Sequence, residues 1–221
     1  MSTRQLEDQA TAATDDAAPG PVAPLALTPA EQRVVAALLR CVARWGLAKT
    51  TIEDLAREAG VSRATVYRLF PGGKDAVLYV AVRAEVHRLL SELLDEALHA
   101  EDLEVCLVRG VHHAAQFLGG HPALSFLRDH ERAVLEQVIA FERLDVVLVS
   151  AGVALQPALG RFLSPADAHD AGVWCARLVL SYLAEPAQDV DLTRLEDVQR
   201  LVRTFVLPGL SPLGPDGAAV S

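Results

Sequence analysis

The sequence has few of the residues that cross-link a chain or hold a metal. Its 221 residues include three cysteines, Cys41, Cys106 and Cys175, which are widely separated and form no CxxC pair. This spacing suggests neither a disulfide framework nor a zinc ribbon, and it fits a reducing compartment. His112 and His113 are adjacent, so they lie on different faces of a helix, unlike a chelating pair four residues apart. We therefore expect no metal site.

Long apolar runs are also missing. No segment approaches the roughly 20 apolar residues that span a bilayer, and the most apolar one, residues 146–155, is short and follows charged residues. The N-terminus carries acidic residues and lacks the apolar core of a secretory signal. We expect a cytoplasmic protein without a membrane partner.

Motifs of common enzyme classes are absent. The chain has no GxSxG and no HExxH pattern. The segment Gly72-Gly73-Lys74-Asp75 resembles a phosphate-binding loop in part, but Arg68 stands where that pattern needs Gly and Asp75 where it needs Ser or Thr. Lysine is absent after Lys74, which removes any Schiff-base or phosphate-binding lysine from the C-terminal half. We expect no catalytic residue, no enzyme activity and no cofactor.

The formal net charge of -9 argues against a nucleic-acid partner until its distribution is considered. Residues 1–27 hold one Arg and four acids, giving -3, whereas residues 28–90 hold ten Lys and Arg and six acids, giving +4. Residues 91–221 hold nine Arg and nineteen acids, giving -10. A basic module is therefore joined to an acidic one, and the basic module remains compatible with nucleic acid.

Helical patterns run through most of the chain. Thr28-Pro29-Ala30-Glu31 predicts a helix start with a capping box, and Gly46 predicts the end of that helix. After residue 75 the apolar residues follow a helical period without strand alternation, so we expect an all-α fold. Breaks between its helices are expected at Gly119-Gly120, Pro157, Ser164-Pro165, Pro186 and Pro208-Gly209.

A sharp corner between two short helices is the most informative feature. Ile52, Leu55, Ala56 and Ala59 share one apolar helix face. Gly60 can take a positive φ where the chain reverses, and Ser62 can cap the next helix. In that helix Val66, Leu69 and Phe70 share an apolar face. The pattern predicts a helix-turn-helix over about residues 52–70.

The opposite face of the second helix is polar. Ala64 and Arg68 lie farthest from Val66, flanked by Thr65 and Tyr67, and Arg63 lies near the N-terminal end. Arg can donate two hydrogen bonds to guanine, and Thr and Ala can contact the thymine methyl, so this face suits a major groove. We expect phosphate contacts from Thr51, Tyr67 and Lys74. The predicted DNA-binding residues are Thr51, Ser62, Arg63, Ala64, Thr65, Tyr67, Arg68 and Lys74. An ordinary amphipathic helix pair within an all-α core remains the alternative.

This segment resembles the DNA-binding region of the tetracycline-repressor (TetR) family. The resemblance covers about residues 30–80 and is carried by Thr50-Thr51-Ile52, by Gly60-Val61-Ser62 at the turn, and by Thr65-Val66-Tyr67-Arg68-Leu69-Phe70. The linker Pro71-Gly72-Gly73 is one residue longer than the family's common form. The resemblance implies an N-terminal three-helix helix-turn-helix domain followed by a larger helical domain that binds a small effector and forms a dimer.

Four segments are expected on this basis: an N-terminal arm at residues 1–27, the DNA-binding domain at 28–78, the effector-binding and dimerisation domain at 79–207, and a flexible tail at 208–221. By the same resemblance the last two long helices, near residues 165–184 and 192–207, form a homodimer. The residues predicted for that interface are Gly172, Trp174, Leu178, Leu201, Val202 and Phe205. An ordinary intrachain core is the alternative for these residues.

Helices near residues 101–118 and 130–156 offer an apolar lining for an effector of apolar or acyl type. The predicted pocket residues are Val111, His112, His113, Phe117, Phe126, Leu127, Val138 and Phe141, with the two histidines as polar contacts. Plain core packing is the alternative for the apolar members.

These features together predict a DNA-binding transcriptional regulator, a dimeric repressor that a small-molecule effector releases from its operator. Its two recognition helices would enter successive major grooves, about 34–36 Å apart in typical helix-turn-helix dimers. Two alternatives stay open: a DNA binder that needs no effector, and a helical adaptor that binds proteins.

Overall fold

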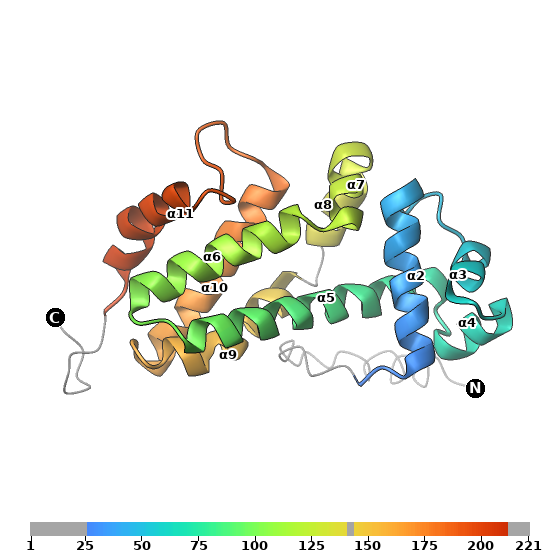
Figure 1. Ribbon diagram of the computed structural model, residues 1–221, viewed down its shortest axis with the longest axis horizontal. Helices are drawn as coiled ribbons and strands as arrows, with labels where there is room; N and C mark the ends of the chain where they lie inside the picture. The colour runs from blue at the N-terminus through green and yellow to red at the C-terminus, as the bar shows by residue number, and fades with distance from the viewer. Residues whose placement is uncertain (1–25, 141–143, 212–221) are drawn as a thin grey trace, which may run out of the picture.

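A computed structural model describes residues 26–140 and 144–211, without side chains for residues 137–146, and all regular elements in these ranges are helices. The expected arm and tail therefore lie almost entirely outside the described residues. The molecule is elongated, with three short helices at one end and the C-terminal helices at the other (Figure 1). The all-α fold predicted from sequence is confirmed.

The N-terminal domain consists of α2 (Pro29–Trp45), α3 (Ile52–Ala59) and α4 (Arg63–Leu69). Thr28 and Glu31 form the predicted capping box at the start of α2, and Gly46 ends that helix with a φ of 84°. The positive φ is available to glycine at little steric cost, so the chain can leave the helix there.

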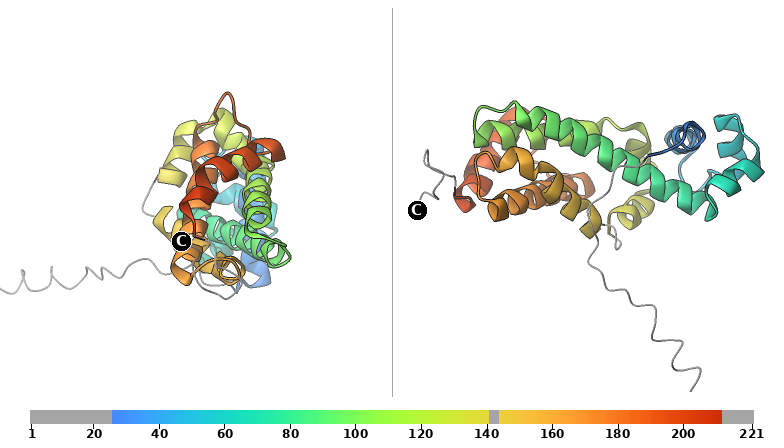
Figure 2. Two further views of the ribbon diagram at one scale, coloured as in Figure 1. Left: turned by 90° about the vertical axis from the view of Figure 1, so that its left-hand side faces the viewer. Right: turned by 90° about the horizontal axis from the view of Figure 1, so that it is seen from below.

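A single helix, α5 (Gly73–Leu98), connects the N-terminal domain to the rest of the molecule. It runs along the long axis of the molecule, as Figure 1 and the right-hand view of Figure 2 both show. Val77 and Ala81 near its start are buried against the N-terminal domain, whereas Leu93 and Ala97 near its end are buried in a second core. The domain boundary expected after residue 78 thus falls inside this helix.

The larger body is built around α6 (Leu103–Gly119), α9 (Leu144–Leu159) and α10 (Pro165–Ala184), which pack with the second half of α5. Two shorter helices, α7 (Pro122–His130) and α8 (Arg132–Ala140), lie between this body and the N-terminal domain. The chain ends in α11 (Leu195–Leu201), a π-helical turn (Val202–Val206) and a 3-10 turn (Leu207–Gly209).

Two sequence predictions about the body are wrong. The single helix expected over residues 130–156 is three elements, because α7 ends at His130, α8 spans Arg132–Ala140 and α9 begins at Leu144. The break expected at Pro157 is also incorrect, because α9 continues to Leu159. Proline lacks an N–H donor but accepts helical φ, so it can stand in the last turn when packing holds the helix together.

The apolar residues form two separate cores. The first contains the buried faces of α2, α3 and α4 together with Ala123 and Leu127 of α7 and Leu135 of α8. The second is formed by α5, α6, α9, α10 and α11. Because α7 and α8 contribute to the first core, the N-terminal domain is packed directly against the body.

Candidate DNA-binding surface and effector cavity

Local hydrogen bonds position the two helices of the helix-turn-helix. The Thr51 side chain caps α3 by accepting from the Asp54 N–H at 3.3 Å, and the Asp54 carboxylate accepts from the Thr51 N–H at 3.0 Å. Thr51 is the main cause of the lowered pKa of the Asp54 carboxyl. Gly60 takes the left-handed conformation with a φ of 66°, and Ser62 caps α4 by accepting from the Thr65 N–H. The turn at Gly60 and the cap at Ser62 match the sequence prediction.

Helix α4 presents one face to the core and another to solvent. Val66 is fully buried and Phe70 is 4% exposed, while Leu69 is half-buried. On the other side Arg63, Ala64 and Arg68 are exposed, and Tyr67 is 48% exposed. Thr65 is half-buried, and its hydroxyl lies 2.9 Å from that of Ser62. The predicted polar face is therefore accessible along the helix.

Two of the predicted DNA-binding cations already have partners within the chain. Arg63 Nη1 lies 2.5 Å from Glu53 Oε1 of α3, in an exposed ion pair. Lys74 Nζ donates to the Leu47 carbonyl at 3.0 Å, in the loop after α2. Exposed ion pairs contribute about 0–1 kcal/mol, so the Arg63 pair can open at little energetic cost. Through its hydrogen bond to the Leu47 carbonyl, Lys74 connects α5 to that loop.

Sequence reasoning missed the residue that holds this loop from the other side. Glu131, between α7 and α8, accepts from the Leu47 N–H at 2.7 Å and from the Ala48 N–H at 3.3 Å. A Cβ at Gly46 would lie 2.3 Å from Glu131 Oε1, so only glycine fits beside this carboxylate. Glu131 and Gly46 are far apart in sequence, and no local motif signals their contact.

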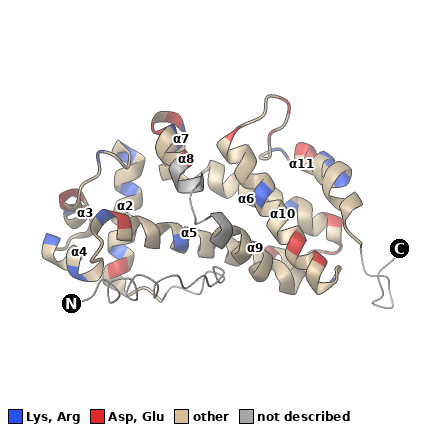
Figure 3. Ribbon diagram, turned by 180° about the vertical axis from the view of Figure 1, so that it is seen from behind, with Lys and Arg blue, Asp and Glu red and all other residues tan. Residues whose placement is uncertain are grey.

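Basic side chains are present at the end of the molecule that carries α2 and α4, as Figure 3 shows. Arg40 and Arg44 of α2 both contact Glu58 of α3 and lower the pKa of that carboxyl. Arg68 has no ion pair among the described residues, so its guanidinium remains available to an external acceptor.

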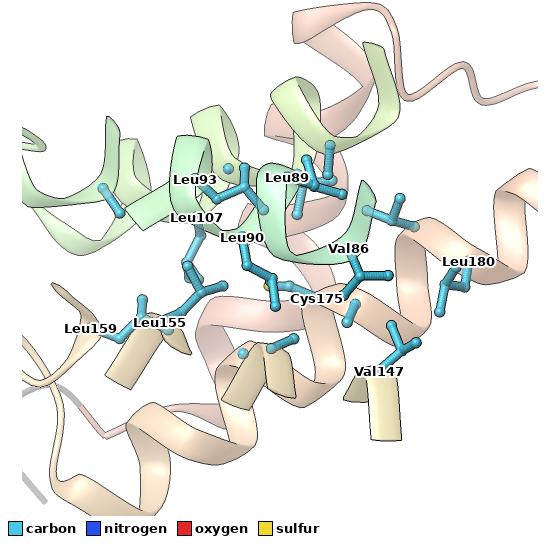
Figure 4. A pocket seen from close by; sticks show the side chains of 18 of the residues that line it. Val86, Leu89, Leu90, Leu93, Leu107, Val147, Leu155, Leu159, Cys175 and Leu180 are labelled. Carbon is cyan, nitrogen blue, oxygen red and sulfur yellow. The ribbon is translucent and has the colours of Figure 1, made fainter. Parts of the chain in front are cut away.

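A cavity of about 850 Å³, including its open part, lies inside the body. We call it the body cavity; its lining comes from α5, α6, α9 and α10 and is almost entirely aliphatic (Figure 4). Two thiols, Cys106 and Cys175, belong to this lining, and burial raises their pKa to about 11 and about 12. Both thiols are therefore protonated at neutral pH and add little polarity.

A second apolar cavity, of about 1060 Å³ including its open part, lies where the N-terminal domain meets the body. We call it the junction cavity. It is lined by Leu38, Leu39 and Val42 of α2, by Leu47, and by residues of α5, α6, α7, α8, α9 and α10. His121 Nε2 and Glu85 Oε2 lie 3.5 Å apart in this lining and form its polar pair.

The residues predicted for the pocket are distributed over several environments. Val111 lines the body cavity, and Phe117 and Leu127 line the junction cavity. Val138 lies in α8 and Phe141 follows it, but their side chains are outside the described residues. The remaining residues, His112, His113 and Phe126, line neither cavity.

His112 and His113, which were expected as polar contacts of the pocket, contact other groups of the chain instead. His112 Nδ1 contacts the Leu192 carbonyl at 3.2 Å, and His113 lies between Glu92 at 3.1 Å and Glu96 at 2.9 Å. Adjacent positions on α6 direct both rings away from the lining at Val111 and Ala114. Phe126 stacks on His130 with ring centroids 4.5 Å apart.

The residues predicted for the dimer interface also separate into two groups. Trp174 and Phe205 are 68% and 73% exposed, which is unusual for large apolar side chains. Leu201 and Val202 are buried in the body core, and Leu178 packs against it. Gly172 allows a close approach as expected, but to α9 of the same chain, because a Cβ there would lie 3.0 Å from the Ala151 carbonyl.

In the described part of the chain, no group of three or more His, Cys, Asp or Glu side chains is arranged to hold a metal ion. None of the helices described is both long enough and apolar enough to cross a membrane.

Comparisons with known proteins agree with the helix-turn-helix geometry. A family model described as bacterial regulatory proteins, tetR family, matches residues 34–79. No curated protein matches the chain by sequence.

Solved structures share the fold over most of the chain. The TetR family repressor AlkX from Dietzia sp. is 21% identical, with 81% of this chain and 95% of that chain covered and a TM-score of 0.63. The fatty acid degradation regulator FadR from Bacillus halodurans is 19% identical, with 82% and 98% covered and a TM-score of 0.57. FadR from Bacillus subtilis, solved with stearoyl-CoA, is 18% identical, with 78% and 97% covered and a TM-score of 0.54.

At these identities the structural likeness shows the fold, and the family model adds the helix-turn-helix itself. The helix-turn-helix segment thus matches the tetracycline-repressor (TetR) family of bacterial regulatory proteins, and the chain as a whole has the fold of solved regulators such as AlkX and FadR.

Proposed function

We propose that the protein is a dimeric repressor whose α4 helices read an operator in the cytoplasm, and that an uncharged alkyl ligand in the body releases it from DNA. The observation that carries the DNA-binding part is the exposed face of α4, with Arg68 and Tyr67 directed outward while Val66 is fully buried.

Arg68 is the proposed base-reading residue, because it is exposed and has no intrachain ion pair among the described residues. Ala64 and Thr65 would contact thymine methyls, and Arg63 would join them once its pair with Glu53 opens. Tyr67, Ser62 and Thr51 would contact phosphates from the same side of the domain. Lys74 keeps two N–H donors beyond its bond to Leu47, so it can reach a phosphate without leaving the loop.

The proposed dimer face includes Trp174 of α10 and Phe205 of the π-helical turn, together with Leu195, which is 51% exposed. Trp and Phe are enriched in protein interfaces relative to the rest of the surface. The substitution Trp174→Arg with Phe205→Arg should give monomers in sedimentation equilibrium. A double variant that remains a dimer would show that a different surface is used.

The effector class follows from the cavities. None of the described residues that line the body cavity is charged, and a carboxylate buried without a cation is strongly disfavoured. An uncharged alkyl chain is the ligand that such a lining accepts. Two proteins with the same fold support the alkyl part of this proposal: AlkX is implicated in the biodegradation of n-alkanes, and Bacillus subtilis FadR was solved with stearoyl-CoA.

The DNA-binding part is tested by selecting genomic fragments that the purified protein retains. Once a fragment is known, the double substitution Tyr67→Ala with Arg68→Ala should weaken binding at least about 10-fold and reduce sequence preference, since a base-reading Arg contributes about 1–3 kcal/mol. Arg109→Ala, which removes an exposed arginine from α6, serves as the matched control. Unchanged binding by the double variant would exclude α4 as the reading helix.

The two alternatives give different results. A DNA binder without an effector would retain its fragments in the presence of any alkyl ligand, and a protein-binding adaptor would retain no fragment selectively. A salt titration adds an independent measurement, because phosphate contacts make log K fall linearly with log salt concentration. A flat dependence would contradict the phosphate contacts.

A further inference from the structure

The body cavity and the junction cavity share part of their walls. Five residues line both: Val86 and Leu89 of α5, Leu118 of α6, Val147 of α9, and Leu180 of α10. Cavities that share wall residues from four different helices lie next to each other, separated at most by aliphatic side chains that can change rotamer. The two cavities can therefore act as one apolar channel.

Three of the shared residues lie toward one end of the body cavity. Figure 4 shows Val86, Val147 and Leu180 close together at the end opposite Leu155 and Leu159. The direction of the channel is thus set: it passes from Leu159, deep in the body, past Val86, and continues toward the N-terminal domain.

The side chains that line the two cavities determine which class of ligand can bind there. Both cavities are lined almost entirely by aliphatic groups, and the junction cavity adds Phe117 and the Glu85–His121 pair. Glu85 Oε2 and His121 Nε2 face each other, so both polar groups already have a partner within the chain. An uncharged alkyl chain matches an apolar space of this kind.

A third hollow, which lies beside the body cavity, does not suit an anionic headgroup. It is lined by Asp189, Asp191 and Asp197 as well as by Arg128 and Arg194. Both arginines already form ion pairs with neighbouring acids. The acids outnumber the arginines, which favours an uncharged ligand over a carboxylate.

The far wall of the channel belongs to the helix-turn-helix domain. Leu38, Leu39 and Val42 of α2 line the junction cavity together with Leu47. The Leu47 backbone is held on both sides, by the Glu131 carboxylate at its N–H and by Lys74 at its carbonyl. A group that enters this cavity consequently contacts the N-terminal domain at the loop that Glu131 and Lys74 position.

We propose that the junction cavity is a second binding segment for the alkyl ligand: the far end of an unbranched chain lodged in the body cavity enters it and contacts α2 and Leu47. The inference rests on the proposed function of the body cavity. Release from DNA then depends on chain length, because only chains long enough to pass Val86 touch the N-terminal domain. A ligand confined to the body cavity binds without releasing DNA.

The inference is tested with primary alkanols from octanol to hexadecanol, by calorimetry and by release of a selected DNA fragment. In the unmodified protein, affinity should rise about fourfold for each added methylene, the fold-change that corresponds to its burial. Ala123→Phe places a ring in the junction cavity and should stop this rise at an intermediate length while leaving octanol binding unchanged. Gly110→Leu places a side chain in the body cavity, where a Cβ meets no atom within 4 Å, and should weaken every alkanol.

A measurement on the unmodified protein tests the proposal even if Ala123→Phe does not fold. Hydrogen exchange of the unmodified protein should change in α2 and residues 46–50 with hexadecanol, and only in the body helices with octanol. Equal changes in α2 with both alkanols, or a length dependence unaffected in folded Ala123→Phe, would overturn the proposal. Failure of every alkanol to bind would instead refute the alkyl effector of the proposed function.

Discussion

The N-terminal domain and the body differ in how their helices are held in place. In the N-terminal domain, short helices are defined by neighbouring residues: Thr28, Thr51 and Ser62 cap them, and Gly46 and Gly60 end them. In the body, long helices pack through residues far apart in the chain and leave the body cavity among them.

The difference fits the function that we propose for each part. A DNA-reading helix has to present Arg68 and Tyr67 in a fixed orientation, so it benefits from a tight core in which Leu38, Leu55 and Val66 are fully buried. An effector domain needs space for a ligand and must be able to change shape when that space is filled. In this proposal the tightly packed domain carries the DNA-reading helix, and the body that contains the cavity can adjust its packing to a ligand.

The largest expected effect compares a leucine from each part. Leu55→Ala removes a fully buried side chain from the N-terminal domain and should lower the free energy of unfolding by about 3 kcal/mol. Leu90→Ala should cost only about 1 kcal/mol, because Leu90 is half-buried and already faces the body cavity.

The two tryptophans allow the two parts to be followed separately in urea titrations. Trp45 lies at the end of α2 and Trp174 lies on α10, so each is the sole reporter when the other is replaced by Phe. Equal losses for Leu55→Ala and Leu90→Ala would contradict the contrast between a tight domain and a hollow body.

A pair of glycines inside the body should give smaller effects of opposite sign. Gly172→Ala would bring a Cβ within 3.0 Å of the α9 backbone, which should destabilise the protein by about 1–3 kcal/mol. Gly110→Ala would meet no atom within 4 Å and should stabilise α6 by about 0.5–1 kcal/mol. Thermal unfolding measures both; a Gly110→Ala variant that is destabilised would show that this helix needs glycine for another reason.

A smaller effect is expected at the contact between the two parts. Glu131→Gln keeps the shape of the side chain but replaces the charge-assisted bonds to the Leu47 and Ala48 N–H groups, so the N-terminal domain should lose about 1 kcal/mol of stability. Glu136→Gln, in the exposed Arg132 pair on α8, is the control. If both variants unfold at the same urea concentration as the unmodified protein, Glu131 does not hold the loop.

The smallest effect is a pH dependence at the junction. The hydrogen bond from His121, with a contribution from Arg88, lowers the pKa of the Glu85 carboxyl below its ordinary value of 4.5. A lowered folded-state pKa gives stability that is present above the ordinary value and is lost as pH falls through the lowered one. Glu85→Gln should therefore make stability fall less steeply with acid below about pH 4.5.

Urea midpoints measured from neutral pH down to the acid range check this expectation. Glu101→Gln, at an exposed position before α6, should leave the acid slope unchanged. A slope for Glu85→Gln that matches the unmodified protein would show that the Glu85–His121 contact does not contribute to acid stability.

The sequence predicted the N-terminal domain well and the body less well, for a physical reason. Capping residues and glycines act over three or four positions, so Gly60 and Ser62 could be assigned their roles from sequence. The exposed face of α4 followed from its helical period alone. Pocket residues could not be assigned this way: Val111 lines the body cavity, but its neighbours His112 and His113 do not.

Sequence by itself determined the helical class of the chain, the basic character of its first module, and the corner at Gly60 that directs Arg68 outward, because each depends on neighbouring residues or on composition. Only the tertiary structure decided that Glu131 holds the loop at Leu47, that Gly172 packs against α9, and that two cavities meet at Val86. These features join segments far apart in the chain, and a local sequence pattern does not predict which distant residues are in contact.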